Sequence, residues 1–253
     1  ACTTEAGIMD PTPLTLCYGQ TVSTSTAIGS NLELGDTLLY FLVSQANMPP
    51  GWTIVAVSSS PTFAFNPAIM MASTTYFIVA VAGNVGGMNG VDLNDPCLSI
   101  IPGPTVIWRP EVTATLSGAP VVCPGSTASI NVQFTGDGPF NFAYTDGTTP
   151  QSLTGINQNP YVIQVTPAIN TGYSLVNVTG AGNCPGTISG NASVTLSNPP
   201  QALSVMVNCD LVNETYTLTF DIGNGAQPNP VYTVLGIQGT LTCLLYTSDA
   251  ADE

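Results

Sequence analysis

The amino-acid sequence predicts an all-β protein, and two observations lead to this class. Apolar and polar residues alternate with a period of two in short segments between Gly, Pro and Asn/Asp, whereas no segment sustains the 3.6-residue period of a helix. Only 6% of the 253 residues are charged, and exposed helix faces normally carry Lys, Glu and Arg, while exposed strand faces tolerate Thr and Ser. The predicted strands are Thr37–Ser44, Thr75–Gly83, Glu111–Gly118, Ala128–Phe134, Tyr161–Pro167, Tyr173–Gly180, Ala192–Ser197 and Tyr216–Gly223.

Internal repeats indicate that the strands belong to tandem domains. Short strands about 8 to 12 residues apart, joined by Gly/Pro turns, are typical of β-sandwiches of the immunoglobulin type. The segment "LCYGQTVS" (Leu16–Ser23) is similar to "VCPGSTAS" (Val122–Ser129), and both contain Cys-x-Gly-x-Thr. Further on, Phe63–Gly83 is similar to Ile163–Gly182, since both contain Pro-Ala-Ile and then a Tyr that opens a strand. Each copy closes with a cysteine, so we expect two copies of one domain.

Two proline-containing linkers, Ile107–Val112 and Ser197–Leu203, set the expected boundaries. A sandwich of this type needs about 100 residues, so the segment after the second linker is too short for a whole third domain. We expect an immunoglobulin-like domain with an N-terminal linker in residues 1–109, a second in 110–199, the N-terminal part of a truncated third in 200–242, and a non-native tail in 243–253.

The last eleven residues, "CLLYTSDAADE" (Cys243–Glu253), differ in character from the rest. The bases TGT CTC TTA TAC ACA TCT encode Cys243–Ser248, and this stretch resembles a transposase mosaic end and adapter of a sequencing library, translated in frame. Such a tail carries no information about the fold. Without it the formal net charge changes from -14 to -11 and the cysteine count from seven to six. The alternative is a genuine, frayed terminal strand.

The charge balance excludes two classes of partner. The chain has one Lys or Arg, fifteen Asp or Glu, no His and a formal net charge of -14. Binding to nucleic acid through its phosphates needs basic side chains, so we expect no nucleic-acid partner. The same charge argues against an anionic membrane surface, and no stretch approaches the roughly 20 apolar residues of a membrane-spanning helix.

The cysteines are predicted to form disulfides. With no imidazole in the chain, a zinc site or a Cys-His catalytic pair is disfavoured. Each repeat has one cysteine after its first strand and one near its last, which predicts the pairs Cys17–Cys97 and Cys123–Cys184. Cys2 and Cys209 are then predicted to be unpaired in this segment, Cys2 as the closing cysteine of an earlier repeat and Cys209 separated from its partner. The alternative is buried free thiols in a cytosolic protein.

Three segments resemble a known family: Cys2–Val22, Gly35–Ser44 and Ala82–Trp108, of which "VDLNDPCLS" within the third is the most specific. They are similar to the repeat region of large secreted Bacteroidota surface proteins, gliding-motility-associated and adhesin-like, that the type IX secretion system exports. The resemblance covers Cys2 to about Thr240. It implies immunoglobulin-like or PKD-like modules of extracellular stalks, without catalysis, and it implies that this chain is an internal fragment between a signal peptide and a sorting domain.

Acidic residues are the remaining candidates for chemistry. Two carboxylates suffice for a glycosidase, and Asp92 with Asp95, or Asp137 with Asp146, are candidate pairs. All lie in Gly-rich or Asn-rich segments, where Asp occurs for backbone reasons, so we expect no enzyme. Calcium takes oxygen ligands from such loops, which makes Asp92, Asn94, Asp95 and Asp137 weak calcium candidates in a chain for which we otherwise expect no cofactor.

Aromatic residues and the single arginine are assigned mainly structural roles. Tyr76 and Tyr173, each near the start of a late strand, fit the tyrosine corner of sandwich folds. Arg109, beside the first linker, is expected to pair with a carboxylate such as Glu111 across the domain junction. Stacking on a sugar is the alternative role for the aromatic residues Trp52, Trp108, Tyr18 and Tyr40, of which Tyr40 fits a core position.

These observations predict a non-enzymatic segment of an extracellular stalk or adhesin at a bacterial cell surface. Its expected partners are the neighbouring domains of the same chain, with surface glycans or other cells as the ligands of an adhesive face. The alternative is a pair of carbohydrate-binding accessory modules of a secreted multidomain hydrolase. A row of solvent-facing aromatic side chains would favour that alternative, and buried aromatic side chains would count against it.

Overall fold

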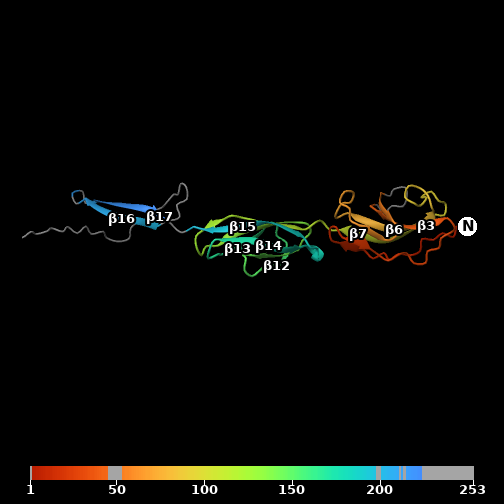
Figure 1. Ribbon diagram of the computed structural model, residues 1–253, viewed down its shortest axis with the longest axis horizontal. Coiled ribbons are helices and arrows are strands. Elements are labelled where there is room, and N and C mark those ends of the chain that lie inside the picture. The colour runs from red at the N-terminus through yellow and green to blue at the C-terminus, as the bar shows by residue number, and fades with distance from the viewer. Residues whose placement is uncertain (1, 45–52, 198–200, 211, 213–214, 224–253) are drawn as a thin grey trace, which may run out of the picture. The chain divides into compact units, whose positions relative to one another are not determined.

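The computed structural model describes residues 2–44, 53–197, 201–210, 212 and 215–223 (Figure 1). Trp52 and the predicted tail at 243–253 lie outside the described residues. By contacts the chain divides into two compact units: one holds Ala1–Ala119, Ser129–Gln164 and Gly172–Ser193, and the other holds Pro120–Ala128, Val165–Thr171 and Val194–Glu253. The predicted domain boundaries stay a prediction.

The first group of strands forms a β-sandwich within residues 14–108. Its five-stranded sheet has the order β1-β7-β6-β3-β4, and its two-stranded sheet pairs β2 with β5; Figure 1 labels β3, β6 and β7. The strands are β1 (Leu14–Leu16), β2 (Thr21–Ser23), β3 (Asp36–Val43), β4 (Ile54–Ser58), β5 (Thr62–Ala64), β6 (Thr75–Asn84) and β7 (Ser99–Trp108).

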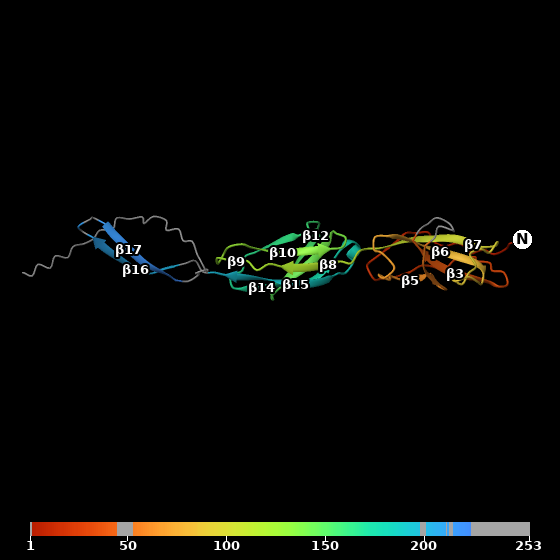
Figure 2. The same ribbon diagram turned by 90° about the horizontal axis from the view of Figure 1, so that it is seen from above.

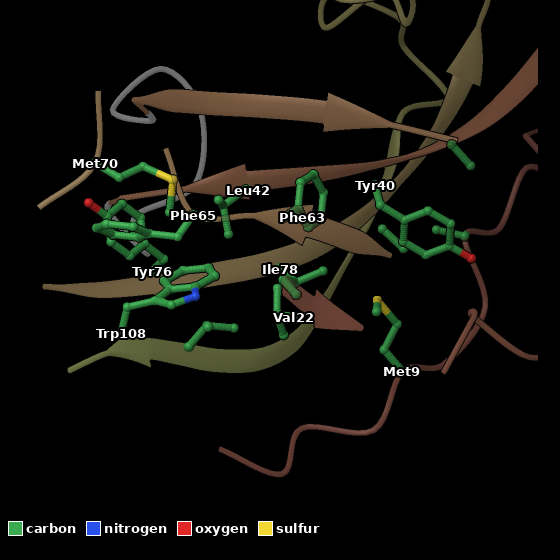
Figure 3. Close-up of a cluster of buried hydrophobic side chains, with 14 residues drawn as sticks. Met9, Val22, Tyr40, Leu42, Phe63, Phe65, Met70, Tyr76, Ile78 and Trp108 are labelled. Atoms are coloured by element: carbon green, nitrogen blue, oxygen red, sulfur yellow. The ribbon is translucent and has the colours of Figure 1, made fainter. Parts of the chain in front are cut away.

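Side chains of both sheets fill the core of this first sandwich (Figure 3). Val22 on β2 and Phe63 on β5 lie in the same cluster as Leu42 and Ile78 of the larger sheet, with Trp108 at the end of β7. A second cluster lies on the larger sheet's other face, where strand residues pack with loop residues: Phe41, Val43, Val79, Val81 and Val91. Because β3 and β6 are buried on both faces, their sequences "DTLLYFLV" and "TYFIVAVAGN" are nearly continuous apolar runs.

A second β-sandwich is built from strands within residues 113–196. The strands pair in the order β12-β11-β14-β15-β8-β10-β13, and β9 pairs with β15; Figure 2 shows β8, β10 and β15. They are β8 (Thr113–Ser117), β9 (Val121–Val122), β10 (Ala128–Thr135), β11 (Phe140–Thr145), β12 (Gln151–Ile156), β13 (Tyr161–Val165), β14 (Thr171–Thr179) and β15 (Thr187–Leu196), with a short 3-10 helix, η1 (Ala181–Asn183), before β15.

The alternating pattern of β10 shows why this sequence forms a sandwich. Its residues are buried and exposed in strict alternation, so Ile130, Val132 and Phe134 point inward while the polar residues between them face solvent. Phe134 stacks on Phe140 of β11, with ring centroids 4.5 Å apart. Two further strands, β16 (Gln201–Asp210) and β17 (Thr215–Gly223), form an antiparallel hairpin. The regular secondary structure of the described residues is thus β apart from the short η1, and the predicted immunoglobulin-type fold is confirmed.

Candidate functional site

Two disulfides are the most distinctive chemical feature of the described residues. Cys2 bonds to Cys97, and the Cα atoms are 5.3 Å apart. Cys17 bonds to Cys184 at a sequence separation of 167, with Cα atoms 5.2 Å apart. Cys17 directly follows β1 of the first sandwich, whereas Cys184 directly follows η1 of the second. The second bond therefore joins one sandwich covalently to the other.

The predicted pairs Cys17–Cys97 and Cys123–Cys184 are wrong, and strand direction gives the reason. β1 runs parallel to β7, and its last residue lies opposite Trp108 at the end of that strand. Cys97 lies before the start of β7 at Ser99, so a ten-residue strand of about 33 Å separates it from Cys17. In the second sandwich β15 separates Cys184 from Cys123 in the same way.

Cys2 was predicted to be unpaired, and this is also wrong. The N-terminal segment runs beside the start of β7: the amide of Ala6 donates to the Ser99 hydroxyl over 2.9 Å. Glu5 forms a β-bridge with Asn31 in the same region. These contacts bring Cys2 to the start of β7, next to Cys97.

Cys209 and Cys123 are the two remaining cysteines among the described residues. Cys209 on β16 is disulfide-bonded, which corrects the prediction that it is unpaired. Cys123 follows β9 and carries a free, exposed thiol, although it was predicted to pair.

Arg109 forms an ion pair with a residue of the second sandwich. Its guanidinium Nη1 lies 3.5 Å from the carboxylate Oδ2 of Asp137, in the turn between β10 and β11. The partner is thus Asp137 and not Glu111, because the turn at 136–139 reaches the linker. The guanidinium also lies beside Gly182 of η1, where an added Cβ would meet Arg109 Nε at 3.4 Å.

Replacing Arg109 with alanine is expected to change stability little. The side chains of Arg109 and Asp137 are 31% and 44% exposed, and exposed ion pairs contribute about 0 to 1 kcal/mol. We expect a loss below about 1 kcal/mol in the free energy of unfolding from urea denaturation. Asp137→Asn should lower the free energy of unfolding by a similar amount, and the double variant should show no further loss. A loss of several kcal/mol for Arg109→Ala would contradict the interpretation of this ion pair as a solvent-exposed contact.

Asp95 is a buried carboxylate that organises the turn before β7. Its side chain is 8% exposed. Oδ2 accepts a hydrogen bond from the amide of Asn84 over 2.6 Å, and Oδ1 accepts one from the amide of Cys97 over 2.8 Å. These two backbone hydrogen bonds lower the pKa of the Asp95 carboxyl, against the opposing effect of burial. Asp95 therefore holds Cys97 in place for its bond to Cys2.

The lowered pKa predicts a loss of stability in acid. Since the folded-state pKa of Asp95 lies below its unfolded value of about 3.9, the stabilisation is complete above that value and disappears as the pH falls through the folded pKa. We expect the urea concentration at the unfolding midpoint of the first sandwich to decrease when the pH is lowered below about 4. The Asp95→Asn variant should have a lower midpoint at pH 7, and its midpoint should decrease less on acidification. Tryptophan fluorescence can follow this, because both tryptophans precede residue 109.

Asp146→Asn is the matched control, since hydrogen bonds from the hydroxyl and amide of Thr148 lower the pKa of Asp146 in the second sandwich. It should leave the pH dependence of tryptophan fluorescence unchanged. An equal acid response in wild type and Asp95→Asn would contradict the role given to Asp95.

The other acidic candidates make local contacts. Asp92 Oδ1 accepts a hydrogen bond from the amide of Asn94 over 3.0 Å, which is a contact within a turn. Asp137 forms the ion pair with Arg109. Among the described residues there is no group of three or more His, Cys, Asp or Glu side chains arranged to hold a metal ion. Calcium binding at Asp92, Asn94, Asp95 or Asp137 stays a prediction.

Most of the described aromatic candidates are buried. Trp108 is 0% exposed, Tyr40 3%, Tyr76 3% and Tyr173 7%, whereas Tyr18 is 38% exposed and packs on Phe65. The Tyr76 hydroxyl accepts a hydrogen bond from the amide of Met71 over 2.8 Å and donates to its carbonyl over 3.3 Å, which is the hydrogen-bond pattern of a tyrosine corner. Tyr173 packs against Tyr144, and burial raises the pKa of both phenols.

The fold and these bonds define a class: tandem β-sandwiches of the immunoglobulin type, cross-linked by disulfides. No helix formed by the described residues is long and apolar enough to cross a membrane.

No protein-family model matches the sequence, and no curated protein matches it significantly. Solved structures that are similar include the four N-terminal Ig domains of Dscam1 isoform 4.44, with 12% identity over 76% of this chain and 45% of that chain and a TM-score of 0.33. An I-band fragment of titin has 10% identity over 77% of this chain and 68% of that chain, with a TM-score of 0.39. The chain spans less than half the length of the Dscam1 structures.

Proposed function

We propose that the chain is a non-enzymatic segment of an extracellular stalk or adhesin in a large bacterial cell-surface protein. The bond between Cys17 and Cys184 is the observation that supports this most, because it keeps successive folded modules together outside their linker. Disulfides form and persist mainly in oxidising compartments, which supports a position outside the cytoplasm. The net negative charge, -14 with the last eleven residues and -11 without them, keeps neighbouring copies apart.

The finer assignment rests on the sequence resemblance at Cys2–Trp108. It supports a gliding-motility-associated or adhesin-like protein of the Bacteroidota that the type IX secretion system exports. The partners proposed are neighbouring domains of the same chain, with surface glycans or other cells as ligands of an adhesive face. The carbohydrate-binding alternative is not favoured by the described aromatics, since Tyr40, Tyr76 and Trp108 are buried.

Surface labelling tests the proposed location. Antibodies raised against the chain should label intact cells of the source bacterium, and limited proteolysis of those cells should remove the signal. Labelling that requires cell lysis would overturn an extracellular role. A cytoplasmic marker protein, measured in the same cells, controls for leakage.

Binding assays with the full chain then separate an adhesin from a spacer. The fluorescent chain is applied to a glycan array and to cells, with the reduced and alkylated chain as a control for folding. Saturable binding that disappears on reduction supports an adhesive face. Absence of binding supports a spacer, and hydrolysis of an arrayed glycan would overturn the non-enzymatic assignment.

A further inference from the structure

Cys17 and Cys123 occupy the same place in their two sandwiches. β1 lies parallel to β7, with Leu16 opposite Trp108, and β9 lies parallel to β15, with Val122 opposite Leu196. The residue after each last strand donates a backbone hydrogen bond to the residue before the cysteine. The amide of Arg109 donates to the Leu16 carbonyl over 2.8 Å, and the amide of Ser197 donates to the Val122 carbonyl over 2.9 Å. Each cysteine thus follows a short strand, β1 or β9, that runs parallel to the end of the last strand of its sandwich.

The turns that begin at these two cysteines also agree. The amide of Gln20 donates to the Cys17 carbonyl over 3.2 Å, and that of Ser126 donates to the Cys123 carbonyl over 3.0 Å. The third residue of each turn is a glycine with positive φ, 76° at Gly19 and 80° at Gly125, as a turn with a left-handed third position requires. The backbone around the two cysteines is therefore equivalent.

The two closing cysteines follow one rule as well. Cys97 precedes β7, the last strand of the first sandwich, and Cys184 precedes β15, the last strand of the second. Each of them bonds to a cysteine that comes earlier in the sequence than the first strand of the same sandwich. Cys97 bonds to Cys2, which precedes β1, and Cys184 bonds to Cys17, which precedes β8. By this rule the cysteine after the strand that runs parallel to the last strand, β1 or β9, bonds to the closing cysteine of the next module. Cys17 obeys it, whereas the equivalent thiol of Cys123 is free and exposed.

Exposed apolar side chains lie at the same end of the second sandwich as this thiol. Val121 on β9 is 53% exposed and Ile169 is 73% exposed. The loop that carries Ile169 lies beside β15, the strand that pairs with β9, because Oδ1 of Asn170 accepts a hydrogen bond from the amide of Leu196 over 2.7 Å. A thiol near exposed apolar residues suits contact with another folded surface.

We propose that the Cys123 thiol forms a disulfide with the closing cysteine of a module that follows the second sandwich. The S–S bond forms as both thiols lose their protons, and the two electrons pass to a small-molecule disulfide such as oxidised glutathione, which becomes two reduced glutathiones. The inference goes beyond the proposed function, because it depends on the repeat geometry and not on adhesion or location. It makes the cysteine at the position of Cys17 and Cys123 in each module a modification site that extends the series of cross-linked modules.

The repeat itself supplies the test. A second copy of residues 110–197 is inserted into the full chain between Ser197 and Asn198, which reproduces the spacing of the first linker because Ser197 corresponds to Arg109. The protein is oxidised in a glutathione buffer, alkylated without reduction, digested and analysed by mass spectrometry. We expect a peptide that joins Cys123 of the first copy to Cys184 of the inserted copy. A Cys123→Ser change in the first copy should abolish this peptide and leave the peptide joining Cys17 to Cys184 of the first copy intact.

Three results would overturn the proposal. The first is an alkylated Cys123 in an inserted chain that is folded by circular dichroism. The second is a covalent dimer through Cys123 whose yield rises with protein concentration, which would identify a second copy as the partner. The third does not depend on the insertion: in the unmodified chain the Cys123 thiol should alkylate at a rate within about tenfold of that in urea. A slower rate, or a bond from Cys123 to another cysteine of that chain, would show that the thiol is not accessible to a following module.

Discussion

Replacing Trp108 with alanine is expected to lower the free energy of unfolding of the first sandwich by about 3 to 5 kcal/mol. The indole is fully buried and lies 5.7 Å from the ring of Tyr76 and 5.6 Å from that of Phe65, measured between centroids (Figure 3). Its Nε1 donates to the Gln20 carbonyl over 2.7 Å. The change therefore opens a cavity and removes a hydrogen bond at the same time.

Two variants separate these contributions. Trp108→Phe keeps most of the packing but leaves the Gln20 carbonyl without its donor, so we expect a loss of about 1 to 3 kcal/mol. Tyr18→Ala removes a half-exposed ring from the same region and should cost below about 1 kcal/mol. Urea unfolding followed by circular dichroism measures all three. Similar losses for Trp108→Ala and Tyr18→Ala would contradict a central position of the indole in the core.

Removing the Cys2–Cys97 bond is expected to have the second largest effect. The paired change to serine should lower the free energy of unfolding of the first sandwich by about 2 to 4 kcal/mol. The bond closes a loop with a sequence separation of 95, and in the chain-entropy model its loss frees the unfolded chain. Tryptophan fluorescence during urea unfolding reports on this sandwich.

Cys123→Ser is the control for this pair, because that thiol is exposed and free. It should leave the urea midpoint unchanged. Adding a reductant to the wild type should give a loss at least as large as that of the paired variant, because it breaks the Cys17–Cys184 bond as well. Equal midpoints for the wild type and the paired variant would show that Cys2 and Cys97 do not constrain the first sandwich.

Strands in which apolar and polar residues alternate were predictable from the sequence. Strands whose pattern is interrupted by proline and glycine were not. The prediction at Ala128–Phe134 agrees with β10 (Ala128–Thr135), since one face is buried and the other is solvated. β7 was not predicted, because Pro102, Gly103 and Pro104 interrupt its pattern. The structure accommodates them with a register shift between β6 and β7 opposite Pro102 and a close approach at Gly103, where a Cβ would meet the Ile78 carbonyl at 2.8 Å.

Contacts between distant segments were the least predictable part of the site. The repeat showed that Cys17 resembles Cys123 and that Cys97 resembles Cys184, but it could not show which ends of the strands meet. That depends on the parallel pairing of β1 with β7 and of β9 with β15. The partner of Arg109 was missed for a similar reason, since Asp137 approaches it only through the turn between two later strands.

The Cys17–Cys184 bond also limits how far the protein can be stretched. A covalent path from Cys2 to Leu196 runs through residues 3–17, crosses this bond and continues along residues 185–196. Residues 18–183 lie outside that path, so they bear no tension even if both sandwiches unfold. The path measures roughly 90 Å when fully extended, against roughly 650 Å for the same chain with both the Cys17–Cys184 and the Cys2–Cys97 bonds broken. A pulled segment of this kind is nearly inextensible, and a reductant would make it about sevenfold longer.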